Sequence, residues 1–153
     1  MEIRYRASNL EETHKLAEAI GSKVSAGDVI LLDGDLGAGK TTWTQVLAKT
    51  IGVTDVVNSP TFSLVNEYQS DKGIFYHFDL YRIDFPQELF DIGFEEYGMQ
   101  NGIMVIEWAH KFIELMPEPY LAIYIKRLSD TEREFVFSGD SLDKFEAVIK
   151  ELG

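Results

Sequence analysis

The sequence has no cysteine, which excludes disulfide bonds, thiolate metal sites and thiol nucleophiles. Only three histidines are present, and they are too scattered to predict a metal cluster: His14, His77 and His110. Long apolar runs are also missing, and no stretch approaches the length of a membrane-spanning helix. The first residues lack the apolar core of a signal peptide. These absences predict a cytoplasmic protein with no membrane association.

Basic residues are scarce, since 14 Lys and Arg against 26 Asp and Glu give a formal net charge of −12. A chain with this charge is not expected to hold a nucleic-acid backbone on its own. The charge is compatible with docking onto a basic protein surface, and equally with a role in solubility. The length of 153 residues and the apolar fraction of 45% predict one globular domain over residues 1–153.

One short stretch matches the phosphate-binding loop pattern G-x-x-x-x-G-K-[ST]. An apolar run at 28–32 precedes it, as expected of a buried strand, and an amphipathic helical pattern at 40–51 follows it. This order of strand, glycine loop and helix favours a true phosphate site over a turn that is glycine-rich by chance. The residues expected to bind the nucleotide here are Gly34, Asp35, Leu36, Gly37, Ala38, Gly39, Lys40, Thr41 and Thr42.

The chemistry of this loop follows from its backbone. A helix N-terminus carries unpaired N–H groups and partial positive charge, and glycines let further N–H groups turn inward without side-chain clashes. Together they form an anion site suited to a triphosphate. We expect Lys40 to contact the β- and γ-phosphates and the Thr41 hydroxyl to bind Mg²⁺. Lys40 is expected to be partly exposed when no nucleotide is bound.

The remaining pattern predicts further strands and helices. A capping box formed by Ser8 and Glu11 is expected to start a helix after a short edge strand. Strands are predicted at 62–68 and 73–81, and a β-hairpin at 120–126 and 132–138. A closing helix follows near the end of the chain.

Two carboxylates end apolar strands in this pattern, and both are candidate catalytic residues. Glu107 follows the apolar run 103–106, where phosphate-loop enzymes place a metal-site acid, typically an Asp. Asp79 lies near the end of the strand at 73–81, although taken alone it is more readily read as a cap or an ion-pair partner. His77 on the same strand is more readily read as a packing residue than as a ligand.

Four blocks of sequence together resemble the TsaE (YjeE) ATPases of the bacterial tRNA threonylcarbamoyladenosine pathway. They are the phosphate loop at 34–42, Ser59-Pro60-Thr61-Phe62, His77-Phe78-Asp79-Leu80-Tyr81-Arg82 and Ile106-Glu107-Trp108. The phosphate loop is shared by many enzymes, whereas the second and third blocks together are far more specific. A further feature of the family pattern is Arg133 before a terminal strand.

The resemblance implies an α/β fold, namely a P-loop NTPase-like domain with a mostly parallel, partly antiparallel central sheet flanked by helices. It implies weak, Mg²⁺-dependent ATP hydrolysis that acts on the TsaD–TsaB complex, which makes N6-threonylcarbamoyladenosine at adenosine 37 of tRNA. No stable direct binding of tRNA by this chain is expected.

The resemblance also implies roles for single residues. Thr41 and Glu107 would surround Mg²⁺, while Asp79 would lie near the γ-phosphate and position water. Residues expected to contact the nucleotide outside the loop are Thr61 in a switch-like segment, Asp79, Trp108 beside the site, and Arg133, for which a partner interface is the other option.

Two other functions remain open from the residues alone. A small-molecule kinase could use the irregular stretch 91–102 as a substrate lid, although no acceptor pocket is readable. A nucleotide-sensing module that does not hydrolyse ATP would need the same loop. A GTPase is disfavoured because the guanine-binding N-K-x-D motif is absent from the sequence.

Overall fold

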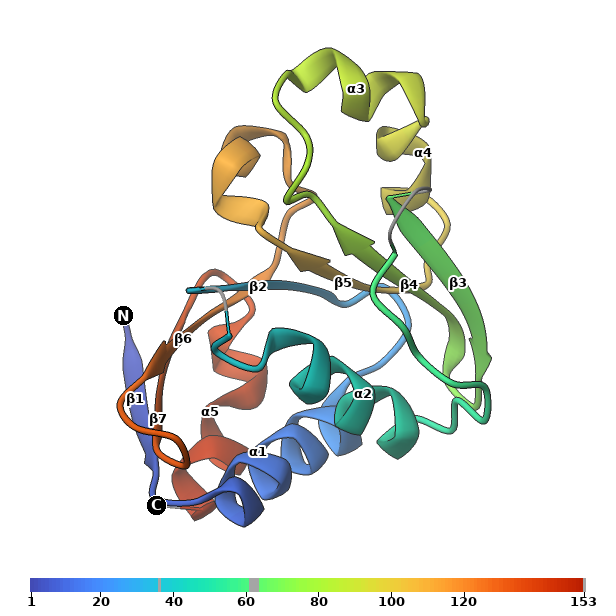
Figure 1. Ribbon diagram of the computed structural model, residues 1–153. Helices are drawn as coiled ribbons and strands as arrows, with labels where there is room; N and C mark the ends of the chain where they lie inside the picture. Colours follow the sequence, from blue (N-terminus) through green and yellow to red (C-terminus); the bar gives the residue numbers. More distant parts are fainter. Residues whose placement is uncertain (36, 61–63, 153) are drawn as a thin grey trace.

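A computed structural model describes residues 1–35, 37–60 and 64–152 of the chain. Its framework is a seven-stranded sheet with the strand order β1-β7-β6-β2-β5-β4-β3 (Figure 1). The strands are β1 (Ile3–Ala7), β2 (Val29–Gly34), β3 (Val65–Ser70), β4 (Gly73–Asp79), β5 (Ile103–Glu107), β6 (Leu121–Arg127) and β7 (Arg133–Ser138).

The sheet combines a parallel centre with antiparallel edges. Strands β6, β2, β5 and β4 run parallel, whereas β3 on one side and β7 and β1 on the other are antiparallel to their neighbours. Every residue of β2 and β5 is buried, as expected of central strands that are covered on both faces. The predicted hairpin is confirmed, since all of β7 pairs with residues Ala122 to Arg127 of β6.

Helices cover the two faces of the sheet unequally. On one face lie α1 (Leu10–Lys23), α2 (Lys40–Thr50) and α5 (Leu142–Leu152), which pack on Ile30 and Leu32 of β2. On the other face α3 (Pro86–Asp91), α4 (Phe94–Gly98) and the 3₁₀ helix η1 (Ala109–Leu115) cover Val29 and Leu31. Alternate residues of β2 therefore anchor two separate cores.

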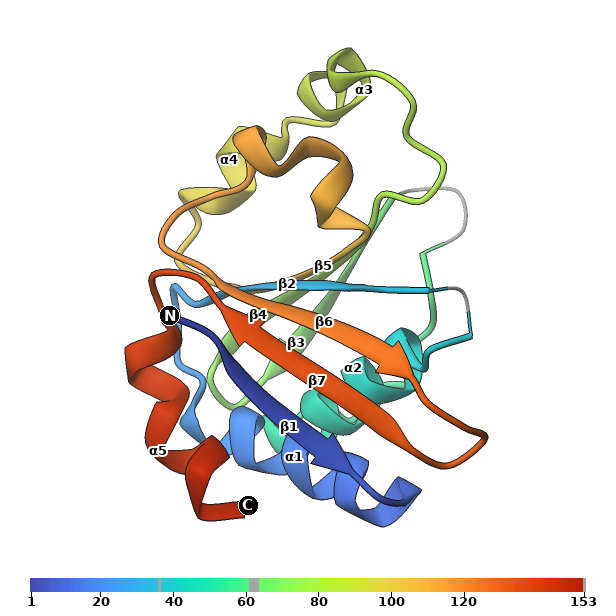
Figure 2. The same ribbon diagram turned by 90° about the vertical axis from the view of Figure 1, so that its left-hand side faces the viewer.

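The second group of helices does not extend over β6, β7 and β1. Figure 2 shows these three strands with α1 and α2 behind them and no helix of the described chain in front. Side chains on this face of β7, such as Val136 and Ser138, are consequently half-buried, while Phe135 and Phe137 on the opposite face are buried. Within the described residues, no helix is long and apolar enough to cross a membrane.

The start of α1 differs from the prediction by one residue. Asn9 caps the helix by accepting a hydrogen bond from Glu12 N at 2.9 Å, and Glu12 Oε1 accepts one from Ser8 N at 3.2 Å. The predicted capping box of Ser8 and Glu11 is wrong because β1 continues through Ala7 and delays the helix. Asn9 and Glu12 thus make a related arrangement one position later, in which Glu12 bonds to Ser8 N and not to the N–H of the cap residue.

Candidate functional site

The phosphate loop connects the end of β2 at Gly34 to the start of α2 at Lys40. Gly39 occupies the helix N-cap with φ of 99° and supplies no side-chain cap, so the first N–H groups of α2 are open to a ligand. Position 34 requires glycine for steric reasons, because a Cβ there would lie 2.5 Å from the carbonyl oxygen of Ile125. The loop therefore presents backbone donors at a helix N-terminus, which is the geometry of an anion site.

The Lys40 side chain folds back onto its own loop. Its Nζ donates to the carbonyl oxygens of Gly34 at 2.7 Å and Asp35 at 2.9 Å, and it lies 4.3 Å from the centroid of the Trp108 ring. The residue is only 6% exposed, so the expectation of a partly exposed Lys40 is wrong. Burial lowers the pKa of Lys40, and the nearby carboxylates, Glu107 foremost, oppose that shift.

Asp79 and Glu107 lie at the same end of two neighbouring parallel strands, where they are paired in register across β4 and β5. Asp79 is half-buried and held at both oxygens. Its Oδ2 accepts from Ser59 Oγ at 3.0 Å and its Oδ1 from Tyr81 N at 3.0 Å. The predicted convergence of two acids that are distant in sequence is thus present at this edge of the sheet.

Glu107 is buried and contacts a second buried side chain. Its Oε2 lies 2.5 Å from His77 Nε2, and both side chains are almost completely excluded from solvent. The other ring nitrogen, Nδ1, has no hydrogen-bond partner within the described residues. His77 therefore does more than pack in the strand, because its Nε2 contacts the Glu107 carboxylate.

A cavity of about 320 Å³ brings most of the predicted site together. Its lining includes the predicted residues Gly37, Gly39, Lys40, Thr41, Thr42, Asp79, Glu107 and Trp108. Ser59 and Tyr81 also line it, although only their neighbours in the motif blocks were predicted as site residues. Gly34, Asp35 and Ala38 form the rest of the described loop, while the predicted residues Leu36 and Thr61 lie outside the described residues.

The donor set of this cavity fits a magnesium nucleotide. The Thr41 hydroxyl and two carboxylates, Asp79 and Glu107, line it together with the loop glycines. The described part of the chain has no group of three His, Cys, Asp or Glu side chains that could form a complete metal cage. A hydroxyl and carboxylates are suitable ligands for Mg²⁺, which takes few protein ligands and completes its shell with phosphates and water.

Arg133 lies behind the loop and is buried. Its Nε donates to the Ala38 carbonyl oxygen at 2.9 Å, and its Nη1 donates to the Ser129 carbonyl oxygen at 2.7 Å. The guanidinium thus ties the phosphate loop to the β6–β7 hairpin. Its predicted contact with nucleotide or partner stays a prediction.

Trp108 follows Glu107 directly and turns the chain out of β5. It has an unusual left-handed backbone with φ of 60°, and its N donates to the Leu32 carbonyl oxygen at 3.2 Å. Its ring contacts both Lys40 and Tyr81, and the centroids of the Trp108 and Tyr81 rings are 5.0 Å apart. The ring therefore forms one wall of the cavity, as predicted for a residue beside the site.

Comparisons with known proteins agree on one family. The family model for "Threonylcarbamoyl adenosine biosynthesis protein TsaE" matches residues 7–135. A protein of that name from Bacillus subtilis is 40% identical over 151 residues, which cover 99% of this chain and 94% of the relative. One from a Nostoc species is 42% identical over 119 residues, which cover 75% of this chain and 72% of the relative. A crystal structure of Bacillus subtilis YdiB superposes with a TM-score of 0.77 at 36% identity. The match covers 99% of this chain and 94% of the YdiB chain.

Proposed function

The chain belongs to the TsaE family, and on that premise we propose that it is a cytoplasmic, Mg²⁺-dependent ATPase of N6-threonylcarbamoyladenosine synthesis in tRNA. We propose further that residues 1–153 act as one domain and that its low ATPase activity serves the TsaD–TsaB complex. The observation that carries the ATPase assignment is the pairing of Asp79 with Glu107 beside the phosphate loop.

In this proposal the loop binds the phosphates through the N–H groups at the start of α2. Lys40 exchanges its bonds to the Gly34 and Asp35 carbonyl oxygens for phosphate oxygens. Because those internal bonds compete with the nucleotide, they lower the affinity for ATP.

The two acids divide the remaining tasks. Glu107, held by His77, and the Thr41 hydroxyl are the groups that would hold Mg²⁺, which when bound neutralises charge on the phosphate oxygens. Asp79 orients the attacking water and accepts its proton, and Ser59 and the Tyr81 N–H hold the carboxylate in place. In this mechanism water is the only molecule needed to accept the γ-phosphoryl group.

The kinase alternative loses its main structural feature. The stretch 91–102, considered above as a lid, contains α4. Phe94 of this helix is buried and packs edge-on against Phe78, with the two ring centroids 5.1 Å apart. A segment anchored in the core in this way is a poor candidate for a mobile lid.

Product analysis tests the proposal directly. With ATP labelled in the γ-phosphate, the purified chain should release inorganic phosphate without any added acceptor, slowly and only with Mg²⁺. Label appearing in a small organic product would support the kinase instead. ATP binding with no release at any concentration of TsaD and TsaB would support the non-hydrolysing sensor.

A further inference from the structure

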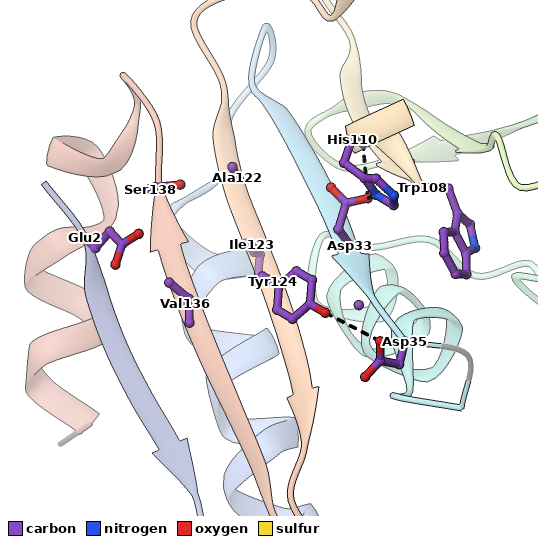
Figure 3. A pocket seen from close by; sticks show the side chains of 11 residues that line it. Glu2, Asp33, Asp35, Trp108, His110, Ala122, Ile123, Tyr124, Val136 and Ser138 are labelled. Carbon is purple, nitrogen blue, oxygen red and sulfur yellow. Dashed lines mark hydrogen bonds and ion pairs between the residues drawn. The ribbon is translucent and has the colours of Figure 1, made fainter. Parts of the chain in front are cut away.

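A second pocket, of about 510 Å³, lies beside the phosphate loop, between η1 and the part of the sheet formed by β6, β7 and β1 that no described helix covers (Figure 3). It extends from Trp108 across β6 to β7 and β1. The side chains that define its character are Asp33, Asp35, Trp108, Tyr124, Val136 and Glu2. Within the described residues, no Lys or Arg lines it.

The pocket is acidic and its carboxylates have free oxygens. Oδ1 of Asp33 accepts a hydrogen bond from the backbone N of His110 at 3.2 Å and lies 2.7 Å from Nδ1 of the His110 ring. Its Oδ2 has no protein partner among the described residues. Asp35 is exposed and meets the Tyr124 hydroxyl at 3.5 Å. Glu2 is the less available acid, since it also pairs with Arg4 at 3.5 Å.

The walls of the pocket are flat and apolar. The rings of Trp108 and Tyr124 stand on either side of the Asp35 and Asp33 carboxylates, and Val136 closes the far side (Figure 3). Burial and the neighbouring Asp35 raise the pKa of the Tyr124 phenol, which agrees with a negative local field. Aromatic faces next to carboxylates favour a planar cation, which can stack and donate paired hydrogen bonds at once.

We propose that this pocket receives an arginine side chain from a partner protein. Guanidinium matches the lining better than ammonium because it stacks on aromatic rings and donates in a planar fork. The net charge of −12 suits docking on a basic protein surface and disfavours an RNA backbone as the occupant.

The position of the pocket gives the arginine a consequence for the nucleotide site. The pocket is lined by Gly34 and Asp35, whose carbonyl oxygens hold Lys40, and by Trp108, whose ring contacts Lys40. An arginine bound there touches the groups that keep Lys40 away from phosphate. The inference shares with the proposed function only the docking of a partner, and does not require ATP hydrolysis.

The probe for the test is N-acetyl-L-arginine amide, titrated into the full chain and followed by ¹H–¹⁵N NMR. We expect shifts at the amides of Asp35, Tyr124 and Val136, with a dissociation constant in the millimolar range typical of a single side chain. N-acetyl-L-citrulline amide, which has a similar shape without the charge, should shift them far less. Equal shifts with both compounds would overturn the proposal.

Val136 supplies the matched variants because it lines the pocket from β7 and belongs to no part of the phosphate site. Val136→Lys should weaken arginine binding by about tenfold or more through its own positive charge, whereas Val136→Gln should not. Both variants should keep the ATP affinity of the wild type, which separates this test from that of the proposed function. Equal arginine affinity in the two variants contradicts the proposal. So does adenosine binding at the same amides more tightly than arginine, which would assign the pocket to a nucleobase.

Discussion

Asp79 and Glu107 are paired across two adjacent parallel strands, so that both carboxylates reach the cavity in front of the phosphate loop. Their surroundings differ. Asp79 is half-buried and bonded to Ser59 and a backbone N–H, whereas Glu107 is buried against His77. This difference is the basis for the proposal that Asp79 orients the attacking water and Glu107 holds the metal.

Asp79→Asn should bind ATP with unchanged affinity and lose hydrolysis by about a hundredfold or more, because the amide keeps the shape but cannot accept the proton. Calorimetric titration measures the first quantity and phosphate release the second. Ser59→Ala should reduce hydrolysis less, since only one of the two bonds that hold Asp79 is removed. Full hydrolysis in the Asn variant would reject the role of Asp79.

Glu107→Ala should raise the Mg²⁺ concentration needed for half-maximal ATP binding. His77→Leu should raise it in the same direction by a smaller factor, because Glu107 then loses the partner that orients it. His77→Gln keeps a donor near the position of Nε2 and should restore most of the Mg²⁺ affinity. If His77→Leu is folded and has the Mg²⁺ dependence of the wild type, His77 is only a packing residue.

Lys40→Ala should abolish measurable ATP binding and also lower the free energy of unfolding by about 1–3 kcal/mol, since the buried carbonyl oxygen of Gly34 and the partly buried one of Asp35 lose their donor. Denaturant titration measures this loss. Lys49→Ala near the end of the same helix is the control, because Lys49 is exposed and should change neither quantity. A Lys40 variant as stable as the wild type would show that the two bonds contribute little.

Trp108 should report nucleotide binding, since its ring loses the Lys40 ammonium when that group moves to phosphate. ATP should change the fluorescence of the wild type and of Trp43→Phe, but not of Trp108→Phe. Trp43, on the buried face of α2, is 1% exposed and serves as the control position. An intact ATP signal in Trp108→Phe would place the sensing residue elsewhere.

Local sequence patterns were sufficient for the phosphate loop, the β6–β7 hairpin and the two strand-ending acids. They were insufficient where long-range packing decides the outcome. The bonds of Lys40 depend on how the loop folds back, and the contact between His77 and Glu107 depends on the pairing of β4 with β5. Neither has a signal in the nearby sequence.

The acidic pocket is a further feature that the sequence could not reveal. It exists because β6, β7 and β1 continue the sheet beyond its second layer of helices, which leaves Tyr124 and Val136 facing outward. Alternation along each strand predicts which residues share a face, but not whether a helix covers that face.

The proposed ATPase function is tested most directly by phosphate release from ATP by the wild type and by Asp79→Asn, each titrated with the TsaD–TsaB complex. We expect that the complex accelerates release by the wild type, and that Asp79→Asn binds both ATP and the complex without releasing phosphate. Equal release by the two proteins, or no release by the wild type when ATP and the complex are both bound, would contradict it.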